Sequence, residues 1–270
     1  MPGAISSASL PEWVVSVSRL DDPRAEAGAS EDEHVLDGFV ARIASDGRRV
    51  ATFLIDPNRR KKDLDAALAF GVQLILRREG RLDLHAAAVA PGSSDGSLLI
   101  VGPKGTGKSS LTIALAMSGW TFLSDDHVVA WREGKELRVA GLRVPLFLTR
   151  DAAERLPAHL PKGQEVLSLN KRMFHPDQLF PGQHRDEGRL DAVVFPERTH
   201  TGPSSLLRLT PMECFQRLLT HSPFLASDPS ARPCIAVARA IADLPAFVLH
   251  AAPDILDPRA ADDLLRTALG

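Results

Sequence analysis

Gly102-Pro-Lys-Gly-Thr-Gly107-Lys108-Ser109 is the stretch that decides the fold. It satisfies the pattern G-x-x-x-x-G-K-[ST]. The apolar run Leu98-Leu-Ile-Val101 precedes it, and the helix-forming run Ser110-Leu-Thr-Ile-Ala-Leu-Ala-Met117 follows it. Strand, glycine loop and helix in this order form the context in which the pattern binds phosphate, so we favour that interpretation over a plain turn.

The residue types in this loop suit the phosphates of ATP. Gly102, Gly105 and Gly107 let the backbone turn without a Cβ and aim its N–H groups at phosphate oxygens. We expect Lys108 to neutralise the β- and γ-phosphates and the Ser109 hydroxyl to hold Mg²⁺. The same predicted ATP-binding set includes Lys104, Thr106 and Ser110. A solvent-facing position is the alternative for Lys104.

A pair of carboxylates follows the loop at short range. Asp125 and Asp126 end the apolar stretch Trp120-Thr-Phe-Leu-Ser, and sixteen residues separate Lys108 from Asp125. One helix and one turn fill that gap, so the strand after the loop helix carries the acids itself. At the end of a strand both side chains can turn toward the phosphates, one to hold metal and the other to accept a hydroxyl proton. A turn or helix-capping pair is the alternative.

This combination resembles the HPr kinase/phosphorylase superfamily, whose fold is shared with ATP-dependent phosphoenolpyruvate carboxykinase. The stretches that carry the resemblance are Leu84-His85-Ala-Ala-Ala-Val89, Leu98–Leu115, Gly119–Asp126 and, more loosely, Asn170-Lys-Arg172 and Leu190–Phe195. The resemblance implies an α/β fold: a P-loop-containing mixed sheet of this type with a small N-terminal α+β region.

The resemblance also implies roles for individual residues. Asp125 would be the base that deprotonates the acceptor hydroxyl and Asp126 the metal ligand, although the two could be exchanged. His85 would tune the catalytic acid, with a structural histidine as the alternative. Lys171 and Arg172 resemble a basic loop that reaches the transferred phosphate, unless they are a surface pair, and we include Arg172 in the predicted ATP-binding set.

Two departures from the family pattern concern the loop and the substrate. Lys104 stands where the family usually has a small residue, which could alter the phosphate contacts. The N-terminal region looks shorter than that of full HPr kinases, which puts HPr itself in doubt as the substrate. Full HPr kinases form closed oligomers, so a homo-oligomer is possible here.

Composition narrows the class of protein. The chain has 270 residues, 44% of them hydrophobic, and a net charge of −2. Nucleic-acid-binding proteins usually carry excess positive charge, which this chain lacks. Tyr is absent and aromatic residues make up 5%, which also argues against a surface that stacks bases. No apolar run approaches a membrane span and no signal peptide is recognisable, so we expect a cytoplasmic protein without a membrane partner. The two cysteines, Cys214 and Cys234, are expected to be buried free thiols.

Periodicity predicts the elements. Residues 1–80 are expected to form an N-terminal α+β region packed on the core, and residues 81–270 the catalytic domain. The predicted strands are 13–18, 49–55, 84–89, 98–101, 121–123, 128–131, 137–139, 190–195, 206–209 and 247–250. The predicted helices are 62–78, the loop helix, 211–220, 231–242 and 257–269, the last with an Asp257-Pro258 start. Residues 22–33 are expected to form a loop, and 150–190 show little regular pattern.

We therefore expect a Mg²⁺-dependent kinase that transfers the γ-phosphoryl group of ATP to a hydroxyl, with serine in a protein or precursor peptide as the favoured acceptor. Three alternatives remain open at this point: a kinase of a small-molecule hydroxyl, a nucleotide-binding switch or assembly ATPase that phosphorylates nothing, and a degenerate binding module. The basic run Asn58–Lys62 is a solvated loop and helix start, or a docking patch for an acidic peptide.

Overall fold

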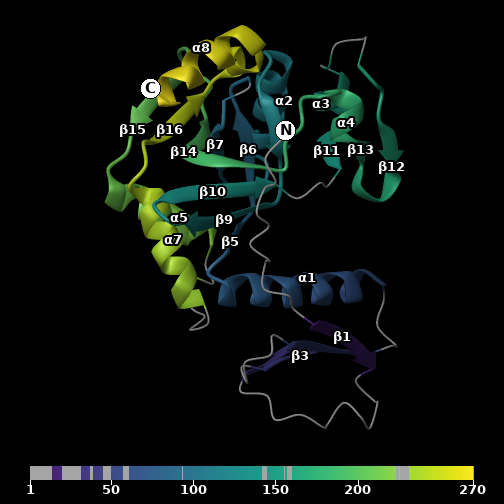
Figure 1. Cartoon of the computed structure of the whole chain (residues 1–270). Helices are drawn as coiled ribbons and strands as arrows, with labels where there is room; N and C mark the ends of the chain where they lie inside the picture. The colour runs from purple at the N-terminus through teal and green to yellow at the C-terminus, as the bar shows by residue number, and fades with distance from the viewer. Residues whose placement is uncertain are drawn as a thin grey trace, which may run out of the picture. The chain divides into compact units, whose positions relative to one another are not determined.

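Figure 1 shows the computed structural model of the chain. It describes residues 14–19, 32–36, 39–44, 50–56, 61–92, 94–141, 145–154, 156, 160–222, 225 and 231–269. The chain divides into two compact units, Met1–Leu76 and Arg77–Gly270. That the N-terminal region packs on the core remains a prediction.

The first unit contains a four-stranded sheet in the order β1-β4-β3-β2. Strands β1 and β4 are parallel, whereas β3 pairs antiparallel with both β4 and β2. Helix α1 follows the sheet and ends in the second unit. The bounds are β1 Val14–Arg19, β2 Asp32–Leu36, β3 Phe39–Ala44, β4 Val50–Ile55 and α1 Lys61–Arg78.

Sequence periodicity predicted β1, β4 and α1, but not the β2–β3 hairpin. Of the predicted loop 22–33, residues 22–31 lie outside the described residues, and Asp32 and Glu33 begin β2 instead. In the basic run, residues 58–60 likewise lie outside the described part, and Lys61 and Lys62 open α1.

The second unit is built on a nine-stranded mixed sheet in the order β5-β9-β10-β14-β7-β6-β8, with β16 beside β14 and β15 beside β16. Strand β14 runs parallel to both β7 and β16. The bounds are β5 Leu82–Leu84, β6 Ala86–Ala90, β7 Gly96–Val101, β8 Thr121–Ser124, β9 Val128–Glu133, β10 Glu136–Gly141, β14 Glu187–Arg198, β15 Ser205–Arg208 and β16 Ala246–Ala251.

Both faces of this sheet are buried, which explains why its central strands are apolar throughout rather than alternating. In β7, Leu99 and Val101 belong to one core cluster, whereas Leu98 and Ile100 belong to another. Helices α5 (Pro211–His221) and α7 (Arg232–Ala242) pack together on the first face. Helices α2 (Lys108–Met117) and α8 (Pro258–Leu269) pack together on the second, as Figure 1 shows.

The helix ends follow the capping rules. Helix α8 begins as predicted, because the Asp257 carboxylate accepts hydrogen bonds from the backbone N–H groups of Arg259 and Ala260, both at 3.0 Å. Helix α5 has a capping box between Thr210 and Glu213, which was not predicted. Cys214 and Cys234 are both buried and do not form a disulfide, as predicted.

Residues 146–179 correct the expectation of little regular pattern between 150 and 190. They form a three-stranded antiparallel sheet in the order β11-β13-β12, together with short helices. This small sheet packs through Leu146, Leu148 and Phe174 on Ile113 of helix α2. The bounds are β11 Leu146–Thr149, α3 Arg150–Glu154, β12 Gln164–Val166, η2 Leu167–Leu169, β13 Lys171–Phe174 and α4 Pro176–Leu179.

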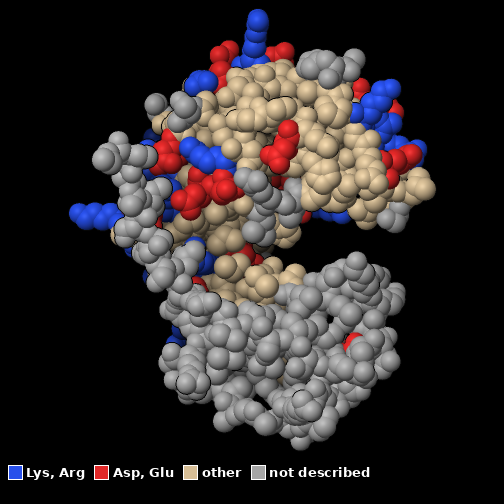
Figure 2. All heavy atoms as spheres, turned by 45° about the vertical axis from the view of Figure 1, so that its right-hand side comes forward, with Lys and Arg blue, Asp and Glu red and all other residues tan. Residues whose placement is uncertain are grey.

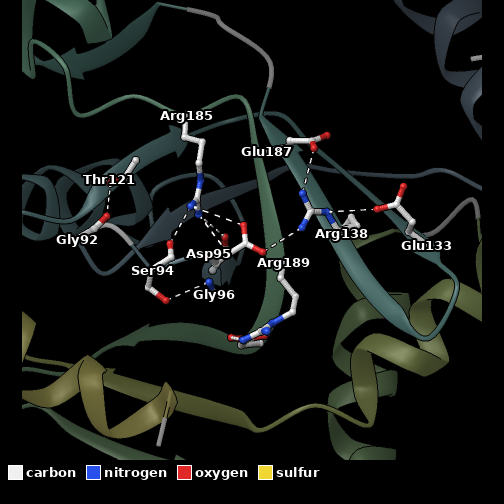
Figure 3. Close-up of polar contacts among 12 residues, drawn as sticks. Gly92, Ser94, Asp95, Gly96, Thr121, Glu133, Arg138, Arg185, Glu187 and Arg189 are labelled. Atoms are coloured by element: carbon white, nitrogen blue, oxygen red, sulfur yellow. Dashed lines mark hydrogen bonds and ion pairs between the residues drawn. The ribbon is translucent and has the colours of Figure 1, made fainter. Parts of the chain in front are cut away.

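A polar network lies around the start of β7 and β14 (Figure 3). The Asp95 carboxylate accepts a hydrogen bond from Arg138 at 3.1 Å and lies 3.8 Å from Arg185. Arg138 also donates to Glu187 of β14 at 3.0 Å, and Arg185 donates to the carbonyl of Ser94 at 2.8 Å. The network therefore connects β10, β14 and the loop before β7 at the end of β7 opposite to the glycine loop.

The described surface carries mixed charge. On the face that Figure 2 presents, acidic and basic side chains gather in mixed groups, and a broad uncharged area separates these groups. Among the residues that the structure describes, no helix combines the length and apolar character needed to cross a membrane.

Candidate functional site

The glycine loop joins β7 to α2 and has the backbone shape that its glycines were expected to allow. Gly105 and Gly107 have φ angles of 93° and 99°, which favour glycine. Gly102 is constrained by space instead of by its φ angle, because a Cβ there would lie 3.1 Å from the Thr106 hydroxyl. Gly107 is the N-cap of α2, and no side chain caps this helix end. The first N–H groups of α2 are thus left for an anion.

Lys108, the first residue of α2, turns back into the loop. Its Nζ donates to the carbonyl oxygens of Gly102 at 2.7 Å and Pro103 at 3.3 Å. The side chain is buried, and this burial lowers the pKa of Lys108, whereas the negative charges of Asp126 and Asp125 raise it. The lysine cation therefore lies at the centre of the loop, held by backbone dipoles.

Asp125 lies directly after β8 and is buried, with 4% of its surface exposed. Burial raises its pKa to about 6, and the neighbouring Asp126 adds to this, whereas a hydrogen bond with Ser109 works in the opposite direction. The Asp125 Oδ1 atom has no hydrogen-bond partner among the described residues. A buried carboxylate oxygen without a partner is costly, and a cation beside it would remove the cost.

Asp126 is half-exposed and faces a histidine. Its Oδ1 lies 2.9 Å from Nδ1 of His85, and its Oδ2 lies 3.6 Å from Nε2 of His127. The hydrogen bond with His85 is the main reason why the pKa of Asp126 lies below its ordinary value. His85 occupies the single position between β5 and β6, where the predicted strand 84–89 divides, and this break turns its side chain toward the acids.

These groups share one cavity of about 460 Å³ at the mouth of the loop. From the predicted set it is lined by Lys104, Gly105, Gly107, Lys108, Ser109, Ser110, Asp125, Asp126 and His85. Strand β11 and the short η2 helix also line the cavity, through Phe147 and Leu169 among others. The structure thus brings the glycine loop, both acids and the histidine around a single space.

Three predicted residues lie outside this lining. Thr106 lines a neighbouring cavity, and its hydroxyl donates to the carbonyl of Pro103 at 3.0 Å. Gly102 contributes its carbonyl to Lys108 instead. Arg172 lies on β13 and donates to the carbonyl of Lys162 at 3.4 Å, whereas the adjacent Lys171 lines the cavity.

Two polar residues of the cavity lining were not predicted. Arg198 ends β14 and Thr149 ends β11, and both line the cavity. A strand over residues 190–195 was predicted, but β14 continues to Arg198, so the prediction stopped short of this residue. Thr149 had no signal, because the small sheet that carries it was not expected.

The donor set suits Mg²⁺ bound together with phosphate. Among the residues described, no cluster of three or more His, Cys, Asp or Glu side chains could hold a metal ion. Mg²⁺, however, usually takes one or two protein oxygens and completes its coordination with water and substrate phosphates. The Ser109 hydroxyl and the unpartnered Asp125 Oδ1 provide hard oxygen donors of this kind.

The chain is similar to known proteins at the level of structure. No protein-family model matches the chain. No curated protein matches it either. Among solved structures, the HPr(Ser) kinase/phosphatase from Coxiella burnetii is similar, with 12% identity, 69% of this chain and 89% of that chain covered, and a TM-score of 0.40. This similarity is too low to argue from, so we interpret the site from the side chains of this chain.

Proposed function

We propose that this protein is a Mg²⁺-dependent kinase that transfers the γ-phosphoryl group of ATP to a hydroxyl, with serine in a protein or precursor peptide as the favoured acceptor. One observation carries the proposal: Lys108, Ser109, Asp125 and Asp126 line a single cavity at the open end of the glycine loop. Phosphoryl transfer needs charge neutralisation on the phosphates and an oriented hydroxyl, and these four side chains are of the kind that supplies both.

The uncapped start of α2 and the loop amides would bind the phosphates of ATP. Lys108 would exchange at least one of its backbone partners, the carbonyls of Gly102 and Pro103, for a phosphate oxygen. Because phosphate is an anion, this exchange replaces a neutral acceptor with a charged one and strengthens the hydrogen bond.

Ser109 and Asp125 would hold Mg²⁺, because both offer oxygen donors and Asp125 is buried with one oxygen unpartnered. When bound, Mg²⁺ neutralises charge on the phosphates. The sequence left open which of the two acids is the base and which binds the metal. The burial of Asp125 favours Asp125 as the metal ligand and Asp126 as the base.

Asp126 would act as the base, because it is half-exposed in the cavity and a substrate can reach it. In the proposed step the acceptor hydroxyl gives its proton to the Asp126 carboxylate while its oxygen forms a bond to the γ-phosphorus. The bond from that phosphorus to the bridging oxygen breaks, and ADP leaves. His85 would orient Asp126 through the 2.9 Å contact.

A polypeptide acceptor is favoured by the surface beside the cavity. Leu167 and Leu169 are 78% and 54% exposed on the short η2 helix, and Leu169 also lines the cavity. Exposed apolar side chains next to a charged site offer contacts to a peptide that carries its own apolar residues. A small polar acceptor would leave them uncovered.

The test measures transfer of labelled γ-phosphate from Mg-ATP to a serine-containing peptide library and, separately, release of inorganic phosphate. The variant Asp126→Asn removes the proposed base, and Asp263→Asn, on an exposed position of α8, is the control. We expect peptide labelling by the wild type and the control but not by Asp126→Asn. Phosphate release without labelling of any peptide, equal in all three proteins, would identify a nucleotide switch instead.

A further inference from the structure

A second cavity, of about 490 Å³, adjoins the first along the glycine loop. Both cavities are lined by Gly107, Ser110, Thr149, Ala152 and Arg198. Arg198 is the only charged residue in this shared set. A ligand that extends from one cavity into the other therefore passes beside Arg198.

The position of Arg198 is fixed by the sheet. Strand β14 runs parallel to β7, with Val194 opposite Ile100, so the end of β14 lies beside the start of the glycine loop. On its other edge Arg198 itself pairs with Ala251 of β16. A Cβ on Gly102 would lie 3.7 Å from the ring of Pro196, which shows how closely the two segments approach. A side chain on such a strand end is held more accurately than one on a loop.

The charge of Arg198 is not balanced within the part of the protein that the structure describes, where it makes no ion pair or hydrogen bond. Its neighbour Glu197 is different, because it accepts a hydrogen bond from Arg217 at 2.7 Å. The guanidinium therefore keeps its donors for a ligand, and the planar arrangement of these donors suits the oxygens of a phosphate.

The cavity that Arg198 shares with Lys108 contains the other groups proposed to act on the terminal phosphate. Lys104 and Lys171 also line it, so four cations face the two carboxylates of Asp125 and Asp126. This excess of positive charge is suited to a polyphosphate, because each added phosphate brings further negative charge.

We infer that Arg198 binds the terminal phosphate of the nucleotide and holds the γ-phosphoryl group during transfer. This inference rests on the proposed function and adds a residue that neither the motifs nor the family resemblance indicated. Arg198 would neutralise charge on the phosphoryl group from the β14 side, while Lys108 does so from the loop.

The experiment measures the affinity of the full chain for Mg-ATP and Mg-ADP by titration calorimetry. The variants are Arg198→Ala and Arg198→Lys, which keeps the charge but loses the planar donors. The control is Arg208→Ala, an exposed arginine near the opposite end of β16, where it pairs with Phe247. Thermal unfolding of each variant shows that it is folded.

We expect Arg198→Ala to weaken ATP binding about tenfold to hundredfold, as for the loss of hydrogen bonds to a charged group, and to leave ADP binding within about twofold. Arg198→Lys should lie between the alanine variant and the wild type. Equal weakening of ATP and ADP, or no weakening of either, would overturn the inference while the wild type still binds ATP. Failure of the wild type to bind ATP would instead overturn the proposed function, and this inference with it.

Discussion

Nζ of Lys108 lies 3.2 Å from Nε2 of His85, and Nδ1 of the same imidazole lies 2.9 Å from Asp126. A neutral His85 with its proton on Nδ1 satisfies both contacts, because it donates to the carboxylate and accepts from the ammonium. The lysine proposed to bind phosphate and the carboxylate proposed to act as base are thus connected through one ring. Binding of phosphate at Lys108 and proton transfer at Asp126 are therefore expected to be coupled.

His85→Ala should slow phosphoryl transfer about tenfold to hundredfold, the range found for groups that orient a functional side chain. Loss of the hydrogen bond also raises the pKa of Asp126 toward its ordinary value, since His85 is the main cause of its lowering. The acid limb of the pH–rate profile should therefore move to higher pH. Transfer rates measured from well below pH 3.8, the ordinary pKa of an aspartate, up to neutral pH test this, with the exposed His175→Ala as control. An unshifted profile would contradict the positioning role.

Lys108→Met should abolish stabilisation by Mg-ATP. At a ligand concentration of a hundred times Kd, the wild type should gain about 2.7 kcal/mol in its free energy of unfolding. The variant removes a cation whose burial lowers its pKa, so without nucleotide it should be at least as stable as the wild type. Thermal melting with and without Mg-ATP tests both statements. A variant that still responds to Mg-ATP would show that the phosphates lie elsewhere.

Asp125→Asn should stabilise the protein at neutral and alkaline pH. Burial raises the pKa of Asp125 from 3.8 to about 6, so its contribution to stability is complete below pH 3.8 and is lost as pH rises through about 6. The difference corresponds to about 3 kcal/mol. The free energy of unfolding should therefore favour the variant at pH 8 and converge with the wild type near pH 4.

Denaturant unfolding at these two pH values, without Mg²⁺, provides the measurement, and the exposed Asp263→Asn is the matched control. A gain of equal size at both pH values would mean that ionisation of Asp125 is not the cause. In the presence of Mg-ATP the order should reverse, because the variant lacks the proposed metal ligand.

Gly141→Ala should lower both stability and transfer activity, although Gly141 lies on β10 and outside the cavity lining. An added Cβ would meet the Leu123 carbonyl and come within 2.8 Å of Ser124 Cβ. These two residues directly precede Asp125 and Asp126. Overpacking of this kind costs about 1–3 kcal/mol. Thermal melting and peptide labelling measure the two effects. Full activity in a destabilised variant would show that β8 does not fix the acids in place.

The sequence predicted the core elements of the site because they are regular and locally specified. The apolar run of β7, the glycines at 105 and 107 and the apolar helix α2 each favour one structure, and the structure contains all three in the expected order. The large mixed sheet confirms the predicted α/β class. The resemblance led us to expect His85 beside the catalytic acid, which was assigned to Asp125. In the structure the partner of His85 is Asp126, and the sequence pattern did not indicate this choice.

The small sheet escaped prediction for a physical reason. Its strands have only three or four residues, and Gln164 and Glu165 on the edge strand β12 are exposed, so no apolar alternation marks them. They are held by packing against α2 and β8, which is tertiary information. Neighbouring residues of a strand point to opposite faces, so only one of Lys171 and Arg172 can face the cavity. Because strand β13 was not predicted, the sequence did not indicate that this residue is Lys171.

The two cysteines have a practical consequence for following the protein in solution. Cys214 and Cys234 are both buried, and burial raises the pKa of the Cys214 thiol to about 12, so thiol reagents should leave it unmodified in the folded state. Thr149 is exposed and lines both cavities. A cysteine introduced there could carry a single fluorophore without removal of the native thiols, and its emission would report nucleotide arrival in real time.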